Sequence, residues 1–205
     1  MINKIINLNL NNHDITAPSK VFEVDGGTLS LSGKGTIKET EPNYGAIMVK
    51  GSIDPSDTNY SVVNVGKDIT LEGWSGIFIS QKNNSAYGLT VNLDGKINAI
   101  KDTSGGTGIG VYVNGNIKHQ ENIPVVNIGD NARIISDGNG LYIAGNAIFN
   151  IKKAYISGME SAIGIKAGTL NIDGARVECL GDDYTPTEGY NNGIKPAGTT
   201  LQIES

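Results

Sequence analysis

The sequence predicts an all-β chain in which short strands stack in repeated turns. Isoleucine, with 27 residues, outnumbers leucine, with 11, and β-branched side chains suit strands better than helices. Glycine, at 28 of 205 residues, is about twice its average usage. A unit of three short strands also recurs along the chain. The β-branched bias argues against a helical bundle, and 38% hydrophobic residues argue against disorder.

The first strand of the unit begins with a glycine or small residue and continues with apolar residues at alternating positions. Its leading apolar positions are 47, 77, 111, 141, 163 and 194, separated by 30, 34, 30, 22 and 31 residues. The copies are Gly45–Val49, Gly76–Ile79, Val111–Val113, Gly140–Ile143, Ala162–Ile165 and Gly193–Lys195.

The second strand has an apolar–Asn–apolar centre. Its copies are Val63–Val65, Val91–Leu93, Val126–Ile128, Phe149–Ile151 and Leu170–Ile172, with Leu29–Leu31 and Leu201–Ile203 as variants. The recurring Asn has two interpretations: a polar surface choice, or amides that hydrogen-bond from turn to turn. A turn containing Gly, Asp or Lys follows. The third strand then closes the unit at Ile69–Leu71, Arg133–Ile135, Tyr155–Ile156 and Arg176–Val177.

Stacking explains this pattern because each strand is too short to form a domain alone. Successive turns would give every strand hydrogen-bonded neighbours about 4.8 Å away. Inward Ile, Val and Leu would then form continuous apolar columns. The shortest period, 22 residues, is near the minimum circuit, and longer periods carry extra residues as loops. The expected loops are Gly51–Tyr60, Gln81–Tyr87, Asn116–Pro124 and Gly181–Asn192.

The phrases Phe22–Leu31 and Gly168–Gly174 resemble repeats of β-helical bacterial surface proteins and phage appendages of the fibre and tailspike type. The chain from about Ile5 to Ile203 resembles the right-handed parallel β-helix of the pectin-lyase-like superfamily. The resemblance implies a solenoid of about seven turns with three strands per turn, roughly 34 Å long. A β-sandwich or jelly roll of short strands is the alternative fold.

We expect residues 1–205 to form a single β-helix domain. Residues 1–20 would be an N-terminal capping segment, in which Ile5–Leu10 starts the stack. The other end is expected to be uncapped and to continue into another chain or domain, because the sequence stops inside a strand.

Composition narrows the classes of partner. The net charge is −5, which argues against nucleic acid and against an acidic membrane surface. Cys179 is alone, so no intrachain disulfide framework is expected. Asn interrupts the N-terminal apolar residues too often for a secretion signal, which predicts a protein made in the cytosol.

The resemblance implies that an enzyme of this fold would cleave polysaccharides with carboxylates and an Arg or Lys base. Arg133 and Arg176 occupy corresponding third-strand positions, but a pair of solvated charges is the simpler interpretation. Asp182 and Asp183 match a Gly-Asp-Asp element of one hydrolase family, without its Gly-His-Gly and Arg-Ile-Lys elements. They are weak catalytic candidates, and no catalytic residue is otherwise predicted.

Metal and cofactor signatures are weak. Asp54 and Asp57 supply too few ligands for Ca²⁺, and His13 and His119 lack cysteine partners for zinc. No metal and no cofactor are therefore expected.

The clearest candidate site is an outward column on the first strands. Its members are Glu23, Met48, Phe78, Tyr112, Tyr142, Gly164 and Lys195. Four consecutive turns place Met, Phe, Tyr and Tyr on one face, and Trp74 lies just before the Phe78 strand. Such an apolar patch is expected to be covered. The cover would be another copy of the chain, the loop Gly181–Asn192, or a stacked sugar chain.

These observations favour a non-enzymatic structural module. The leading hypothesis is an oligomeric bacteriophage virion component, a head fibre, decoration protein or tail appendage, assembled as a homotrimer. Other virion proteins and host-surface polysaccharide are the further partners considered. The second hypothesis is an adhesin or carbohydrate-binding segment of a longer exported protein on the bacterial cell surface. The third is a β-helix polysaccharide lyase or hydrolase.

Overall fold

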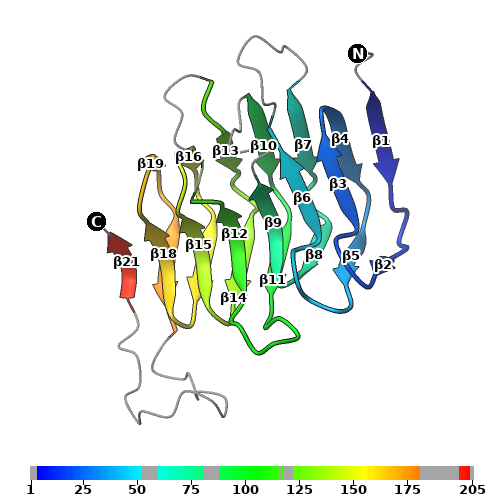
Figure 1. Ribbon diagram of the computed structural model, residues 1–205. Coiled ribbons are helices and arrows are strands. Elements are labelled where there is room, and N and C mark those ends of the chain that lie inside the picture. Colours follow the sequence, from blue (N-terminus) through cyan, green and yellow to red (C-terminus); the bar gives the residue numbers. More distant parts are fainter. Residues whose placement is uncertain are drawn as a thin grey trace.

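The computed structural model describes residues 4–51, 60–80, 88–115, 117, 122–180 and 199–203. Within these ranges every regular element is a strand, and the strands form three seven-stranded parallel sheets. The chain visits the sheets in a fixed order, so that every third strand pairs with its neighbour one turn away. The fold is therefore a right-handed parallel β-helix with three strands per turn, and the sandwich alternative is excluded (Figure 1).

We name the sheets A, B and C in chain order. Sheet A contains β1 (Ile5–Asn9), β4 (Gly27–Ser32), β7 (Ser61–Val65), β10 (Leu89–Leu93), β13 (Val125–Ile128), β16 (Ile148–Ile151) and β19 (Thr169–Ile172). Sheet B contains β2 (Ile15–Ala17), β5 (Gly35–Glu39), β8 (Ile69–Gly73), β11 (Lys96–Ala99), β14 (Arg133–Ser136), β17 (Tyr155–Gly158) and β20 (Arg176–Cys179). Sheet C contains β3 (Phe22–Asp25), β6 (Ile47–Lys50), β9 (Ser75–Ser80), β12 (Ile109–Val113), β15 (Asn139–Ile143), β18 (Ser161–Ile165) and β21 (Thr199–Ile203).

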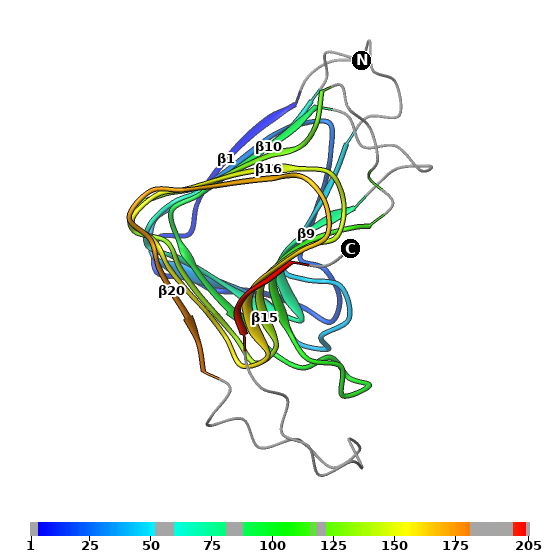
Figure 2. The same ribbon diagram turned by 90° about the vertical axis from the view of Figure 1, so that its left-hand side faces the viewer.

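Viewed along its axis, the coil has a roughly triangular outline with one sheet on each side (Figure 2). Alternate residues of each strand point inward, so apolar columns fill the interior along the whole stack. In sheet A one such column runs from Leu31 through Val65 and Leu93 to Ile151, and these side chains are at most 2% exposed. Among the residues whose burial the structure describes, Phe149 is the largest fully buried side chain. Among the described residues no helix is long and apolar enough to cross a membrane.

Small residues near the beginning of the sheet C strands make the corner with sheet B compact. The column comprises Ala46, Gly76, Gly110, Gly140 and Ala162. A Cβ on Gly110 would lie 2.4 Å from Cγ2 of Ile134, which belongs to the next turn of sheet B. Gly76 stands in the same relation to Ile97 at 2.5 Å. Glycine is thus required at Gly76 and Gly110, because an isoleucine of the next turn packs into the space that a side chain would need.

The seventh strand of sheet C differs from the sequence expectation. We expected Gly193–Lys195 as the last first-type strand, with Lys195 in the outward column. Gly193–Lys195 lies outside the described residues, and the seventh strand of sheet C is β21, in which Gln202 pairs with Gly164. Leu201–Ile203, expected as a second-type strand, therefore lies in sheet C. An apolar–polar–apolar triplet fits any sheet of this solenoid, so pattern alone could not assign it.

The connections between sheets B and C vary in length without disturbing the register. Only Trp74 separates β8 from β9, whereas nine residues separate β11 from β12. Both pairs of flanking strands still align residue by residue with their neighbours in adjacent turns. The variable period seen in the sequence is therefore absorbed largely at the corners.

Candidate functional site

The aromatic stripe is our name for Trp74, Phe78, Tyr112 and Tyr142 on the outer face of sheet C. Phe78, Tyr112 and Tyr142 lie on β9, β12 and β15, where they are direct partners in the parallel register. Met48 on β6 precedes Phe78 in the same column. The structure thus brings together all five residues that the sequence suggested for a binding or oligomer-interface surface.

The rings of the stripe face one another along the rod. Phe78 and Tyr112 are parallel within 3° with centroids 5.1 Å apart, and Tyr112 and Tyr142 stack at 5.9 Å with 17° between planes. Two parallel rings at 5.1 Å are too close to lie side by side in one plane, so they form an offset stack along the rod. Much of the outward surface of the stripe therefore consists of ring edges.

Trp74 packs across this stack and is held by two hydrogen bonds. Its ring makes edge contacts with Phe78 and Tyr112, at centroid distances of 6.2 and 5.8 Å. The indole N–H donates to the Thr107 carbonyl at 2.9 Å, and the Trp74 backbone N–H donates to Glu39 at 3.3 Å. These bonds fix the Trp in place, as expected for a corner residue that packs.

Glu39 supports this corner although it is fully buried. Its two carboxylate oxygens accept the backbone N–H groups of Tyr44 and Trp74. Buried charged groups need such partners, and the carboxylate ties two connections to one point. Sequence reasoning missed this residue, because nothing in the sequence marks one Glu at a strand end as inward-facing.

The two ends of the stripe are closed by different groups. Met48 is only 6% exposed, so little of its side chain is available for contact with another molecule. At the other end, Lys166 Nζ lies 5.4 Å from the Tyr142 ring centroid. Gly164 leaves room for that ring, because a Cβ there would lie 2.9 Å from Tyr142 Cδ2. Phe78, Tyr112 and Tyr142 remain half-buried.

Partial burial also affects the chemistry of Tyr112. Desolvation, together with the neighbouring Tyr142, raises the pKa of the Tyr112 hydroxyl above its ordinary value. The group therefore stays neutral at physiological pH, and the stripe remains an uncharged, mainly apolar surface.

Arg133 and Arg176 do share one outward column on sheet B, with Tyr155 between them. Their guanidinium carbons lie 4.3 and 5.7 Å from the Tyr155 ring centroid, which is cation–π geometry. Arg176 and the Tyr155 hydroxyl also donate to Glu178 and lower the pKa of its carboxyl group, with Arg176 contributing most. Sequence reasoning missed Tyr155, although an Ala precedes all three residues of the column.

The remaining sequence candidates lie largely outside the described residues. This applies to Asp182, Asp183, the loop Gly181–Asn192, the pair Asp54 and Asp57, and His119. Over the ranges that the structure does cover, no group of three His, Cys, Asp or Glu side chains is placed to hold a metal ion.

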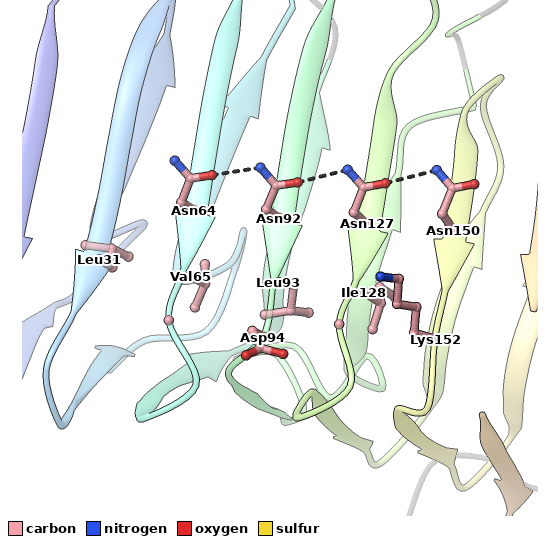
Figure 3. Close-up of a pocket in the computed structure, with 12 residues that line it drawn as sticks. Leu31, Asn64, Val65, Asn92, Leu93, Asp94, Asn127, Ile128, Asn150 and Lys152 are labelled. Atoms are coloured by element: carbon pink, nitrogen blue, oxygen red, sulfur yellow. Dashed lines mark hydrogen bonds between the residues drawn. The ribbon is translucent and has the colours of Figure 1, made fainter. Parts of the chain in front are cut away.

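The repeated Asn residues of sheet A form a hydrogen-bonded ladder, as the second interpretation of the sequence proposed. Each Nδ2 donates to the Oδ1 of the Asn one turn earlier, at 2.7 to 2.9 Å, and Asn64 donates to Ser30 at 3.0 Å. The ladder comprises Asn64, Asn92, Asn127, Asn150 and Asn171. Four of these line a shallow groove of about 440 Å³ (Figure 3). Asp94 and Lys152 lie at the end of the groove where the strands turn toward sheet B.

Comparison with protein-family models, with curated proteins and with solved structures finds no match for this chain.

Proposed function

We propose that this chain is a non-enzymatic structural module: a β-helical rod that packs against other copies of itself through sheet C, most simply as a homotrimer. The observation that carries this proposal is the aromatic stripe, which runs over consecutive turns on one flat face. An apolar surface of this kind on a rod-shaped scaffold fits a contact between chains.

Ring orientation favours a protein contact over sugar stacking at this face. The C–H groups of a sugar carry a slight positive charge and prefer the electron-rich face of an aromatic ring. In the stripe part of each such face is turned toward a neighbouring ring, in the offset stack of Phe78, Tyr112 and Tyr142. Ring edges instead interdigitate well with the apolar side chains of another protein surface.

The setting that we propose is a bacteriophage particle, with the rod as part of a head fibre, decoration protein or tail appendage. This assignment rests on the resemblance of the repeats to pectin-lyase-like β-helices of the phage fibre and tailspike type. Axial ladders suit such a mechanical role, because the Asn ladder and the aromatic stripe both join successive turns. Host-surface glycan would then be a further partner.

The test is the molar mass in solution, measured by light scattering after gel filtration. At low micromolar concentration wild type is expected to give three chains, a mass that further dilution does not reduce. Tyr112→Asp, and separately Tyr142→Asp, should give single chains, because a charge in the stripe cannot be desolvated cheaply. The control is Thr70→Asp, which places the same charge on the outer face of sheet B beside Lys96.

A monomeric wild type, or trimers that survive both stripe variants, would contradict the trimer. Circular dichroism of each variant separates dissociation from unfolding. If the wild type is monomeric but binds polysaccharide, and Tyr142→Asp abolishes that binding, the carbohydrate-binding alternative replaces the trimer proposal.

A further inference from the structure

The two ends of the β-helix expose side chains that belong to its core. Ile6 begins an inward column of sheet A and is 54% exposed, and Ile172 ends another and is 47% exposed. Their partners one turn inward, Leu29 and Ile151, are 4% and 1% exposed. Apolar exposure in these columns is thus concentrated at the first and last turns.

In sheet A, both end strands also present edges with few protective features. Natural sheet edges are commonly blunted by charged side chains or proline. Neither β1, with the sequence IINLN, nor β19, with the sequence TLNI, contains a charged residue or a proline. Each end offers one strand from every sheet: β1, β2 and β3 at one end, and β19, β20 and β21 at the other.

The two ends match each other in sheet A. If β1 of a second copy continued the stack beyond β19, Ile6 would follow Leu170 and Leu8 would follow Ile172 in the two apolar columns. Asn7 would follow Asn171, because Asn7 pairs with Ser30 and so occupies the column of the Asn ladder. The polar and the apolar columns would both continue across the junction.

Sheet B adds charge complementarity. Arg176 is the last residue of an outward column on sheet B. Asp14 is the first, because it lies beside Thr36 in the preceding turn of the same column. A second copy would therefore place its Asp14 beside Arg176, and its Ile15 beside Val177. In sheet C, Phe22 and Val24 of the second copy would follow positions 201 and 203 of the first in the parallel register.

We propose that copies of this chain stack head to tail, with β19, β20 and β21 of one copy pairing with β1, β2 and β3 of the next. The contact is heterologous: two different surfaces meet, so each added copy leaves the same free ends as before. Such an interface produces an open linear assembly instead of a closed ring when the rotation is about the rod axis. It uses the ends of the rod and does not depend on the trimer proposed for sheet C.

Two variants, each blocking one end, test the proposal. Ile6→Lys places a charge in the first turn and Ile172→Lys does so in the last, and both side chains are already about half exposed. Sedimentation velocity of wild type from low to high micromolar concentration is expected to show mass that rises continuously with concentration. Either variant alone has one blocked end and should lose this growth.

Mixing the two variants gives the decisive result. The intact last turn of Ile6→Lys can pair with the intact first turn of Ile172→Lys, and the blocked ends then stop growth. The mixture should therefore form a one-to-one complex and nothing larger. If the chain also forms trimers through sheet C, this pairing of ends would join two trimers. Both end variants are therefore made in a chain that also carries Tyr112→Asp, which is expected to prevent trimer formation.

A wild type whose mass is independent of concentration would overturn the proposal, as would a mixture in which no complex forms. If Ile172→Lys loses its β-sheet signal, Ile172→Asn replaces it, because an uncharged polar side chain at this inward position would still lack a partner in the apolar junction. A failure of head-to-tail growth leaves the trimer result unaffected, because that result is a mass of three chains at low micromolar concentration that variants in sheet C reduce.

Discussion

At the scale of single residues, the corner glycines of sheet C lie where the rod has no room for a side chain. Gly110 is enclosed by backbone and core together: a Cβ would meet the Gly140 carbonyl oxygen at 2.3 Å and Ile134 at 2.4 Å. Neither neighbour is the flexible end of a long side chain, so the clash cannot be relieved by a simple side-chain rotation.

Gly110→Ala is therefore expected to lower the free energy of unfolding by about 2 kcal/mol, the usual cost of overpacking a core. Chemical denaturation measures it. Gly115→Ala is the matched control, because its nearest atom, Ala144 Cβ, would be at an ordinary 3.4 Å. Equal stability of the two variants would show that the corner can expand.

At the scale of the strand, the Asn ladder joins turns through side chains as well as through backbone. Asn127 donates to Asn92 and accepts from Asn150, so its amide is needed in one orientation. Asn127→Asp keeps the acceptor but replaces the donor by a second oxygen, which would face Asn92 Oδ1.

This variant should lose about 1 to 2 kcal/mol of stability at neutral pH, because an acceptor faces an acceptor and the carboxylate is half-buried. The loss should shrink as pH falls below about 4, where the protonated carboxyl group can donate again. Thermal unfolding at several pH values measures both effects. Asn98→Asp, on the exposed face of sheet B, should change stability by less than about 0.5 kcal/mol at either pH.

The sequence predicts where strands of this kind lie, but it predicts only in part which strands and residues they pair with. The alternation of Val63–Val65 and its copies predicted both the inward columns and the stacked Asn residues. Leu201–Ile203 was assigned to the wrong sheet, because its alternation is shared by all three. Glu39 and Tyr155 were missed for a related reason: their roles depend on which residue lies one turn away, and the variable corner loops hide that distance.

At the scale of the whole molecule, the exposed end turns predict unequal local stability. A solenoid is held together mainly by contacts between neighbouring turns, and each end turn has only one neighbour. Amide hydrogens of β10 and β13 should therefore exchange most slowly, and those of β1, β2, β19 and β20 fastest.

Hydrogen exchange followed by mass spectrometry measures this gradient. Uniform exchange along the rod would indicate that it opens only as one cooperative unit. At high concentration the end turns should gain protection if copies stack head to tail, whereas Ile6→Lys should show no such gain.

The freedom of the corners between sheets B and C has a consequence for how such a protein can change. One residue suffices at the corner after β8 and nine are accommodated after β11, while the strands on either side keep their register. Insertions at these corners are therefore separated from the core, and a sequence there can be exchanged at little cost in stability. The rod is in this sense a display scaffold, on which new surface loops can be presented at a spacing set by the pitch of the coil.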